Sequence, residues 1–347
     1  MSAVEARAEA QRIAFGPILF QACWYMQRKG LFDLLARGRT KGLSREEILA
    51  TSGISSYALT VLIDMTVTGG VLWEREGRFG LTKVGLMLAH DRMTKVNMDF
   101  TGDVCYEGMA HLPASLDEGR PAGLQVFGDW PTVYRALSEL PEHVRRSWFD
   151  FDHYYSDHSF PPALDIVFRE KPGTIMDVGG NTGKWAISVL RHDPNIKVVV
   201  VDLPGQLKEV VANVTKAGLA DRLSTAIADM LDPESRLPEG ADVIWMSQFL
   251  DCFSEDEVVA ILRKAHAAMG PNTAMYIMET FIDRQRWQAA SFSLAATSLY
   301  FTAMANGNSR MYRAEAFLPL IERAGLRVTD DIDDVGMGHT VLRCVKA

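Results

Sequence analysis

The sequence contains little that marks a secreted, metal-binding or membrane-spanning protein. It has four cysteines in 347 residues, and none forms a CxxC pair, so neither a zinc site nor a dense disulfide framework is expected. His153, Asp157 and His158 could bind a metal together, but surface His clusters are more common than metal ligands, so we expect no metal. No run reaches the roughly 18 apolar residues of a transmembrane helix, and the first residues lack a signal-peptide pattern. We therefore expect a soluble, cytoplasmic protein without a membrane partner.

Positive charge is also scarce. The formal net charge is −8, which argues against a protein whose main role is binding nucleic acid. The apolar fraction of 48% and the charged fraction of 23% are those of an ordinary globular protein. The length suits two domains better than one core.

The N-terminal part, residues 1–100, has the element order of a winged-helix domain. Residues 5–37 follow a helical period but are apolar around much of the helix, which favours burial in a subunit interface over a plain core helix. Between 43 and 90 the pattern predicts two helices and a β-hairpin. The second helix, 56–67, carries no Arg or Lys, so it lacks the cations that attract DNA phosphates. We interpret this mostly helical domain as the dimerisation domain of a homodimer, and DNA binding as the weaker alternative.

Aromatic residues with interleaved acids are concentrated in the connecting segment, residues 101–160. Phe149, Tyr154 and Tyr155 lie near His153 in the sequence, a combination that suits a pocket for an acceptor molecule. Packing within a connecting helix explains the same composition equally well.

From residue 161 to 347 strands and helices alternate, which predicts an α/β fold with a mostly parallel sheet. Ligands of such sheets bind at the carboxyl ends of the strands. Five polar residues fall at those ends: Asp177, Asp202, Asp229, Gln248 and Glu279.

The clearest ligand signal is the stretch 174–184. A short apolar strand ends at Asp177, and a turn containing Gly179, Gly180 and Gly183 then opens a helix. This order of strand, glycine-rich turn and helix is typical of a nucleotide-type cofactor site. Glycine suits such a turn because it lets the backbone bend sharply and come close to a ligand.

Two further acids narrow the choice of cofactor. Asp202 ends the second strand, where a carboxylate can accept hydrogen bonds from both hydroxyls of a ribose, as in NAD and S-adenosylmethionine enzymes. The Asp-x-Gly-x-x-x-Gly spacing of the turn differs from the Gly-x-Gly-x-x-Gly of dinucleotide folds. Asp229 and Met230 suit an adenine, because the acid can accept from the exocyclic amine while Met packs on the ring. These features favour S-adenosylmethionine (SAM) as the cofactor.

At these residues the chain resembles a known family, the small-molecule O-methyltransferases of the class I methyltransferase fold, which include caffeate, hydroxyindole and bacterial polyketide enzymes. The matching motifs follow in the family's order: Asp177–Gly180, Val201–Pro204, Asp229–Met230 and Phe253–Glu257. The resemblance implies a Rossmann-like SAM-binding domain, a winged-helix dimerisation domain and methylation of a small aromatic or polyketide-like metabolite, most simply on a hydroxyl oxygen. The expected cofactor contacts are Asp177, Gly179, Gly180, Gly183, Asp202, Leu203, Asp229, Met230, Ser247 and Gln248.

The sequence departs from the family at residues that carry the chemistry. The family's third loop glycine is Asn181 here, a residue that tolerates the left-handed conformation. The family's general base is a His after the fourth strand, and that position holds Asp251. By the same register, the Glu that orients this His becomes Met311, and a Lys near the adenine becomes Ser247 with Gln248 beside it.

Three interpretations of this change stay open. Asp251, or alternatively His153, removes a proton from an acceptor hydroxyl, since burial can raise the pKa of a carboxylate towards useful basicity. Alternatively, the acceptor atom is a carbon or nitrogen that needs less help from a base. In the third interpretation the protein binds SAM but catalyses a different reaction. Asp251 can also be a solvated acid before the helix that follows it.

The family places its acceptor pocket at 291–304, although apolar side chains at helical spacing also form plain core. On that placement, the acceptor contacts come from this stretch, from the residues after it and from the connecting segment: Phe149, Tyr154, Tyr155, Tyr300, Met304 and Asn308.

Overall fold

The computed structural model describes residues 1–347, which form two compact units. The first unit comprises Met1–Tyr106 with Arg146–Phe151, and the second comprises Glu107–Arg145 with Asp152–Ala347. Each unit is described by itself.

The first unit is mostly helical, as the sequence predicts. Its helices are α1 (Ala3–Arg28), α2 (Leu31–Arg37), α3 (Arg45–Ser52), α4 (Ser56–Thr68), α5 (Lys83–His90) and α6 (Arg92–Asp99). The short strands β1 (Leu43–Ser44), β2 (Leu72–Arg75) and β3 (Arg78–Leu81) form an antiparallel sheet in the order β1-β3-β2. Ser44 starts α3 with a capping box to Glu47. The predicted order of two helices and a hairpin is confirmed.

The connecting segment, residues 101–160, is largely helical in the structure. A π-helical turn at Phe100–Cys105 follows α6, and the later helices are α7 (Leu112–Glu118), α8 (Val133–Ala136), α9 (Glu142–Asp157) and α10 (Phe160–Val167). Helix α9 contributes its middle to the first unit and its C-terminal turn to the second.

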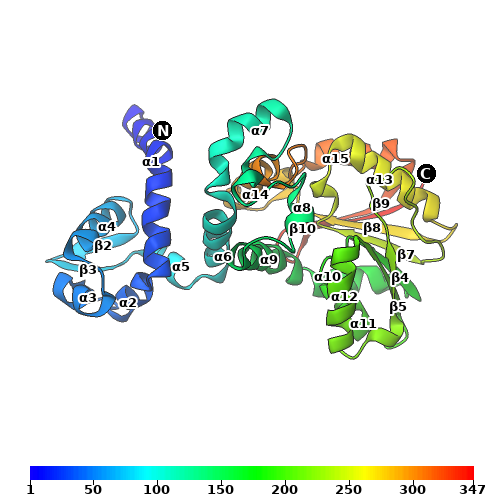
Figure 1. The fold of residues 1–347 in the computed structure, drawn as a ribbon, viewed down its shortest axis with the longest axis horizontal. Helices are drawn as coiled ribbons and strands as arrows, with labels where there is room; N and C mark the ends of the chain where they lie inside the picture. The colour runs from blue at the N-terminus through cyan, green and yellow to red at the C-terminus, as the bar shows by residue number, and fades with distance from the viewer. The chain divides into compact units, whose positions relative to one another are not determined.

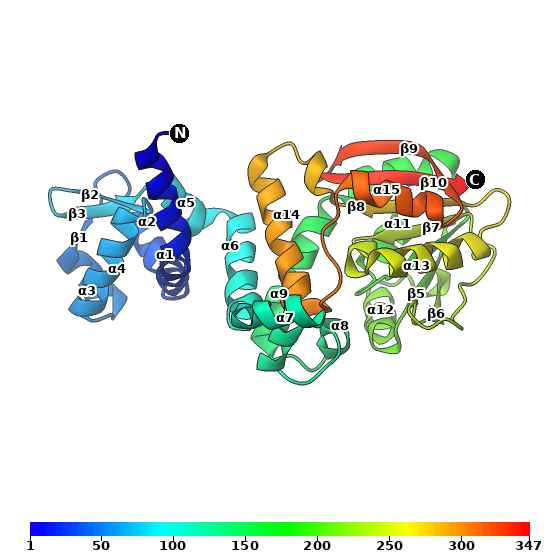
Figure 2. The ribbon, with the colours of Figure 1, turned by 90° about the horizontal axis from the view of Figure 1, so that it is seen from above.

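The second unit is built on a seven-stranded sheet in the order β6-β5-β4-β7-β8-β10-β9. The first five strands in that order are parallel, and the β9–β10 hairpin (red in Figure 2) adds two antiparallel strands at one edge. Its strands are β4 (Thr174–Val178), β5 (Lys197–Asp202), β6 (Leu223–Ile227), β7 (Val243–Ser247), β8 (Ala274–Glu279), β9 (Leu326–Val335) and β10 (His339–Lys346). Its later helices are α11 (Lys184–His192), α12 (Pro204–Lys216), α13 (Glu255–Ala268), α14 (Gln288–Tyr300) and α15 (Ala314–Arg323).

Helices cover both faces of this sheet (Figure 1). Helices α10, α11 and α12 pack on one face around Trp185, and α13 and α15 pack on the other around Phe317. Burial on both faces explains the continuous apolar runs of the central strands. It leaves the carboxyl ends of the strands as the place where polar side chains gather, so the predicted Rossmann-like architecture is confirmed. No helix of the chain combines the length and the apolar character that a membrane crossing requires.

Candidate functional site

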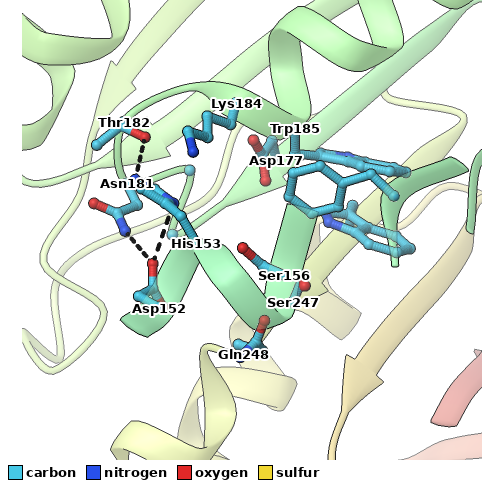
Figure 3. Close-up of a pocket in the computed structure, with 14 residues that line it drawn as sticks. Asp152, His153, Ser156, Asp177, Asn181, Thr182, Lys184, Trp185, Ser247 and Gln248 are labelled. Carbon is cyan, nitrogen blue, oxygen red and sulfur yellow. Dashed lines mark hydrogen bonds and ion pairs between the residues drawn. The ribbon is translucent and has the colours of Figure 1, made fainter. Parts of the chain in front are cut away.

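A pocket lies at the carboxyl ends of β4 and β7 (Figure 3). It brings together five of the residues predicted to bind the cofactor, which are Asp177, Gly179, Gly180, Ser247 and Gln248. Other walls come from the rest of the glycine loop, from α9 and α10, and from two stacked indoles: Asn181, Thr182, Lys184, Asp152, His153, Ser156, Phe160, Trp185 and Trp245.

The loop after β4 accepts only glycine at two positions for steric reasons. A Cβ on Gly179 would lie 2.3 Å from the ring of Phe249, and one on Gly180 would lie 2.4 Å from Val200 Cγ1. Gly179 also has a φ of +77°, and Asn181 takes the left-handed conformation at φ +52°, as expected for an Asn in the family's glycine position. The backbone of the loop is therefore bare where it faces the pocket.

Asp202 fixes this loop from the end of β5. Its Oδ2 accepts from the backbone N–H of Asn181 at 2.9 Å, and its Oδ1 accepts from the N–H of Leu203 at 2.7 Å. Burial raises the pKa of Asp202 to about 6, against the lowering effect of the two N–H donors.

Asp177 is the second acid of this edge. It is 3% exposed, and its Oδ2 has no hydrogen-bond partner. Burial, and then the charge of Asp202, raise the pKa of Asp177 to about 8. A buried acceptor without a donor is costly, so this oxygen fits a ligand that brings its own donor or positive charge.

Asp229 and Met230 follow β6 on the same edge of the sheet, outside the residues that line the pocket of Figure 3. Asp229 Oδ2 accepts from Arg135 of α8 at 3.0 Å, and its Oδ1 accepts from the N–H of Leu231. Met230 is buried. Gly183 also lies outside the lining residues, with a φ of +80° at the start of α11.

The C-terminal turn of α9 is bonded to the glycine loop and to the start of α11 by three side-chain contacts, of which Figure 3 shows the two that involve Asp152 and His153. Asn181 Nδ2 donates to Asp152 Oδ2 at 3.1 Å, and His153 Nε2 lies 3.3 Å from the hydroxyl of Thr182. The third contact joins Lys184 Nζ to Asp157 Oδ2 at 2.6 Å. Sequence reasoning named His153 but missed Asp152, because nothing in the sequence pairs α9 with a loop 29 residues further on.

Asp251 lies in a 3-10 turn, Leu250–Cys252, and is 5% exposed, so it is not a solvated acid. Glu279 holds this turn: its Oε1 accepts from the N–H groups of Phe249 and Leu250 at 3.0 and 2.9 Å. Burial raises the pKa of Asp251 to about 6, and burial with the charge of Asp251 raises that of Glu279. The Cys252 thiol donates to Asp251 Oδ1 at 3.4 Å.

Tyr134 of α8 reaches the same region and was not predicted from the sequence. Its hydroxyl is buried beside the thiol of Cys252. Burial raises the pKa of Tyr134, and the neighbouring Cys252, Tyr300 and Asp251 raise it further. An aromatic side chain on the four-residue helix α8 gave no sequence signal for a site near Asp251.

The predicted acceptor residues fall into separate environments. Tyr300 is buried near Tyr134, whereas Met304 is fully buried and packs against Gly108 and Gly123. Asn308 is exposed and donates to Glu257 of α13 at 3.3 Å. The other three, Phe149, Tyr154 and Tyr155, lie along α9. Phe149 packs edge-on against Trp148 in the first unit, and Tyr154 packs edge-on against Tyr155 in the second.

Comparison with known proteins agrees with this geometry. The O-methyltransferase domain matches residues 163–327, and a Dimerisation2-like domain matches residues 7–79. The 3-hydroxy-5-methyl-1-naphthoate 3-O-methyltransferase of Streptomyces sahachiroi is 34% identical over 73% of this chain and 71% of its own. The L-tyrosine C(3)-methyltransferase of Streptomyces lavendulae is 24% identical over 90% of this chain and 85% of its own. The solved structure of PigF with S-adenosylhomocysteine (SAH) shares the fold, with a TM-score of 0.73, 18% identity and coverage of 98% and 99%.

The residues of the pocket fit SAM. The bare glycine turn gives the backbone a close approach to a ligand, and two buried acceptors, Asp177 Oδ2 and Gln248 Oε1, have no protein donor. The fold and this site define a SAM-dependent methyltransferase of class I. The chain belongs to the O-methyltransferase family represented by the naphthoate enzyme above.

Proposed function

We propose that this enzyme methylates a hydroxyl oxygen of a small aromatic or polyketide-like metabolite and that Asp251 is the general base. The observation that carries the proposal is the buried Asp251 at the family's base position, where burial raises its pKa to about 6. A carboxyl with that pKa is ionised at neutral pH and more basic than an ordinary Asp.

Binding and proton transfer are divided among residues of four strand ends. We assign the ribose to Asp202, the adenine to Asp229 and Met230, and the remaining cofactor contacts to the glycine loop with Leu203, Ser247 and Gln248. SAM, when bound, supplies an electrophilic methyl group.

Asp251 would receive the proton of the acceptor hydroxyl, which leaves an oxyanion able to take the methyl group that bound SAM would supply. We assign donation to that oxyanion to the buried hydroxyl of Tyr134, which lies near Asp251 and Cys252. His153 of α9 is the alternative base. Its Nε2 lies 3.3 Å from the hydroxyl of Thr182 on the cofactor loop, and its Nδ1 lies 3.6 Å from Asp152.

The strength of the base limits the acceptor. A simple phenol has a pKa of about 10, so transfer of its proton to a carboxylate of pKa about 6 costs roughly 5 kcal/mol. Donation from Tyr134 offsets part of that cost, since hydrogen bonds to charged groups contribute about 1.5–3 kcal/mol. The site therefore favours hydroxyls more acidic than that of a simple phenol. We assign the acceptor walls to residues of the second unit, from the C-terminal turn of α9, the last residue of α14 and the segment that follows α14: Tyr154, Tyr155, Tyr300, Met304 and Asn308.

Transfer to a ring carbon is the second candidate. It is supported by the L-tyrosine C(3)-methyltransferase, which matches 90% of this chain. The same deprotonation by Asp251 would make the ring carbons next to an oxyanion nucleophilic.

The test uses SAM labelled with carbon-13 in its methyl group and a panel of hydroxylated aromatic acids and amino acids. A labelled methoxy signal in the product supports O-methylation, and a labelled ring-methyl signal supports the second candidate. If the label stays on the cofactor with every acceptor while SAM binding is measured directly, methyl transfer by this chain is refuted.

We further propose that the enzyme is a cytoplasmic homodimer. The Dimerisation2-like match over residues 7–79 supports the dimer, and so do the apolar side chains that α1 exposes, among them Ile13, Phe15 and Ile18. Four unpaired cysteines support a reducing compartment. Light scattering after size-exclusion chromatography tests the dimer: a monomeric mass at micromolar concentration would exclude it.

A further inference from the structure

Asp152 is a half-buried carboxylate in the wall of the cofactor pocket, with 26% of its side chain exposed, and no motif of the family accounts for it. It lies on α9 and faces the glycine loop across the pocket (Figure 3). Its Oδ2 accepts from Asn181 Nδ2 at 3.1 Å and lies 3.6 Å from His153 Nδ1. The acid is thus held in place by the same loop that we expect to hold SAM.

One possible cation contacts Asp152, the His153 imidazole 3.6 Å away, which carries a charge only when it is protonated. Asp251 faces it from the turn after β7, and Asp157 from the next turn of α9. Lys184 of α11 is near enough to lower its pKa, but this ammonium is bonded to Asp157 at 2.6 Å. On the β4 side the pocket adds Asp177, a further acid. The acids around Asp152 therefore outnumber the cations, which are Lys184 and, when it is protonated, His153.

We propose that Asp152 is the residue by which this pocket distinguishes the positively charged sulfonium of SAM from the neutral thioether of SAH. SAM and SAH share every group except the transferred methyl and the positive charge on sulfur. A carboxylate in a partly desolvated pocket is stabilised by an opposite charge more than a fully exposed one is. Asp152 lines the pocket, is fixed by Asn181 and is bonded to no permanently charged side chain, so it is suited to respond to that one charge.

The charge balance of the reaction gives this arrangement a purpose. Methyl transfer converts the sulfonium into a thioether, and the acceptor proton passes to Asp251, so the site as a whole keeps its charge. Asp152 nevertheless loses the positive charge of the sulfonium, beside which we place it. Binding is then weaker for the product cofactor than for SAM, which favours exchange of SAH for SAM.

The proposal has a defined pH dependence. Burial, followed by the charges of Asp251 and Asp157, raises the pKa of Asp152 to about 7. Above that pH the carboxylate is already ionised, so SAM binds without a change in the protonation of Asp152. Below it, SAM binding must displace a proton, and affinity falls towards tenfold for each pH unit. SAH carries no charge on sulfur and has no such dependence through Asp152.

Isothermal titration calorimetry of the full chain without acceptor tests the proposal. SAM, SAH and sinefungin, in which an amine-bearing carbon replaces the sulfonium, are titrated at about pH 6 and about pH 8, on either side of the Asp152 pKa. Asp152→Asn is expected to weaken SAM and sinefungin about tenfold or more at the higher pH while changing SAH by less than about twofold. Buffers of different ionisation enthalpy should report more proton release on SAM binding to the wild type than to Asp152→Asn at the lower pH, since the other titratable groups of the pocket, Asp177, Asp202 and His153, are present in both proteins.

Asp165→Asn is the matched control, because it removes a negative charge from an exposed position on α10. It should affect the three ligands equally. Thermal unfolding of Asp152→Asn verifies that the variant folds. Equal weakening of SAM and SAH by Asp152→Asn, or an unchanged preference for SAM, would overturn the proposal, whatever the enzyme's acceptor is.

Discussion

The Asn181 side-chain amide donates to Asp152 at 3.1 Å and so joins the cofactor loop to helix α9. The backbone N–H of Asn181 donates at the same time to Asp202, at 2.9 Å. One residue therefore links the end of β5, the glycine turn and α9. A glycine at this position would keep the left-handed backbone but would leave Asp152 without its donor.

Asn181→Gly tests this link. Glycine adopts φ +52° without strain, so we expect the fold to survive and SAM affinity to fall by less than about tenfold, the effect of one hydrogen bond of about 1 kcal/mol. Asn181→Ala should unfold at a lower temperature, because a left-handed residue with a Cβ costs roughly 1–2 kcal/mol. Calorimetric titration and thermal unfolding check the pair. Equal unfolding temperatures for the two variants would contradict the role of backbone conformation.

Asp251 governs the predicted pH profile of turnover. With a pKa of about 6, the carboxylate loses its function as base when protonated, so kcat/KM should fall as the pH drops below about 6. Asp251→Asn should lower kcat by about 10²–10⁴, the usual contribution of a general base, while the affinity for SAM stays within a few fold. Asp251→His restores the family's base and should recover part of the rate. Undiminished turnover in Asp251→Asn would exclude this residue as the base.

The acids at the carboxyl ends of the strands were predictable from the sequence, whereas the approach of Asp152 and Tyr134 to Asp251 was not. Asp177 and Asp202 follow apolar strands directly, and parallel strands bring their carboxyl ends together. Asp152 and Tyr134 belong to helices whose sequences contain no such marker. They approach Asp251 only because the chain folds α8 and α9 back over the strand ends, which is tertiary packing that periodicity does not encode.

Asp202→Asn should separate cofactor binding from stability. The change removes a charged acceptor from the N–H groups of Asn181 and Leu203 and from the ribose, so we expect SAM affinity to fall about 10- to 100-fold. Asp242→Asn is the control, since Asp242 accepts from the N–H groups of Gly173 and Thr174 at the opposite end of β4. It should lower the unfolding temperature without a comparable loss of affinity. Equal affinities of the two variants for SAM would remove Asp202 from the cofactor site.

Gly180→Ala tests the steric basis of the loop. The new methyl group would lie 2.4 Å from Val200 Cγ1 and 3.0 Å from Asp177 Oδ2, so the loop or strand must shift, at a cost of about 1–3 kcal/mol. We expect lower thermal stability and weaker SAM binding. Gly205→Ala has open space around its Cβ in the first turn of α12 and should be neutral or slightly stabilising. A Gly180→Ala protein as stable as Gly205→Ala would contradict the packing described for this turn.

Asp177 should make the ligand-free enzyme less stable as the pH rises. Its folded pKa is about 8, and its unfolded pKa is about 3.9. A raised folded pKa means that the stabilising contribution of the protonated acid is complete below about pH 4 and is lost as the pH rises towards 8. Asp177→Asn removes this dependence and should be more stable than the wild type at pH 8 by about 1–3 kcal/mol, the typical cost of an unsatisfied buried polar group. Denaturant unfolding at several pH values, without and with SAM, measures the effect. The advantage of Asn should shrink when SAM is present, because the cofactor supplies what the Asp177 carboxylate lacks; an advantage that is independent of both pH and SAM would rule out this explanation.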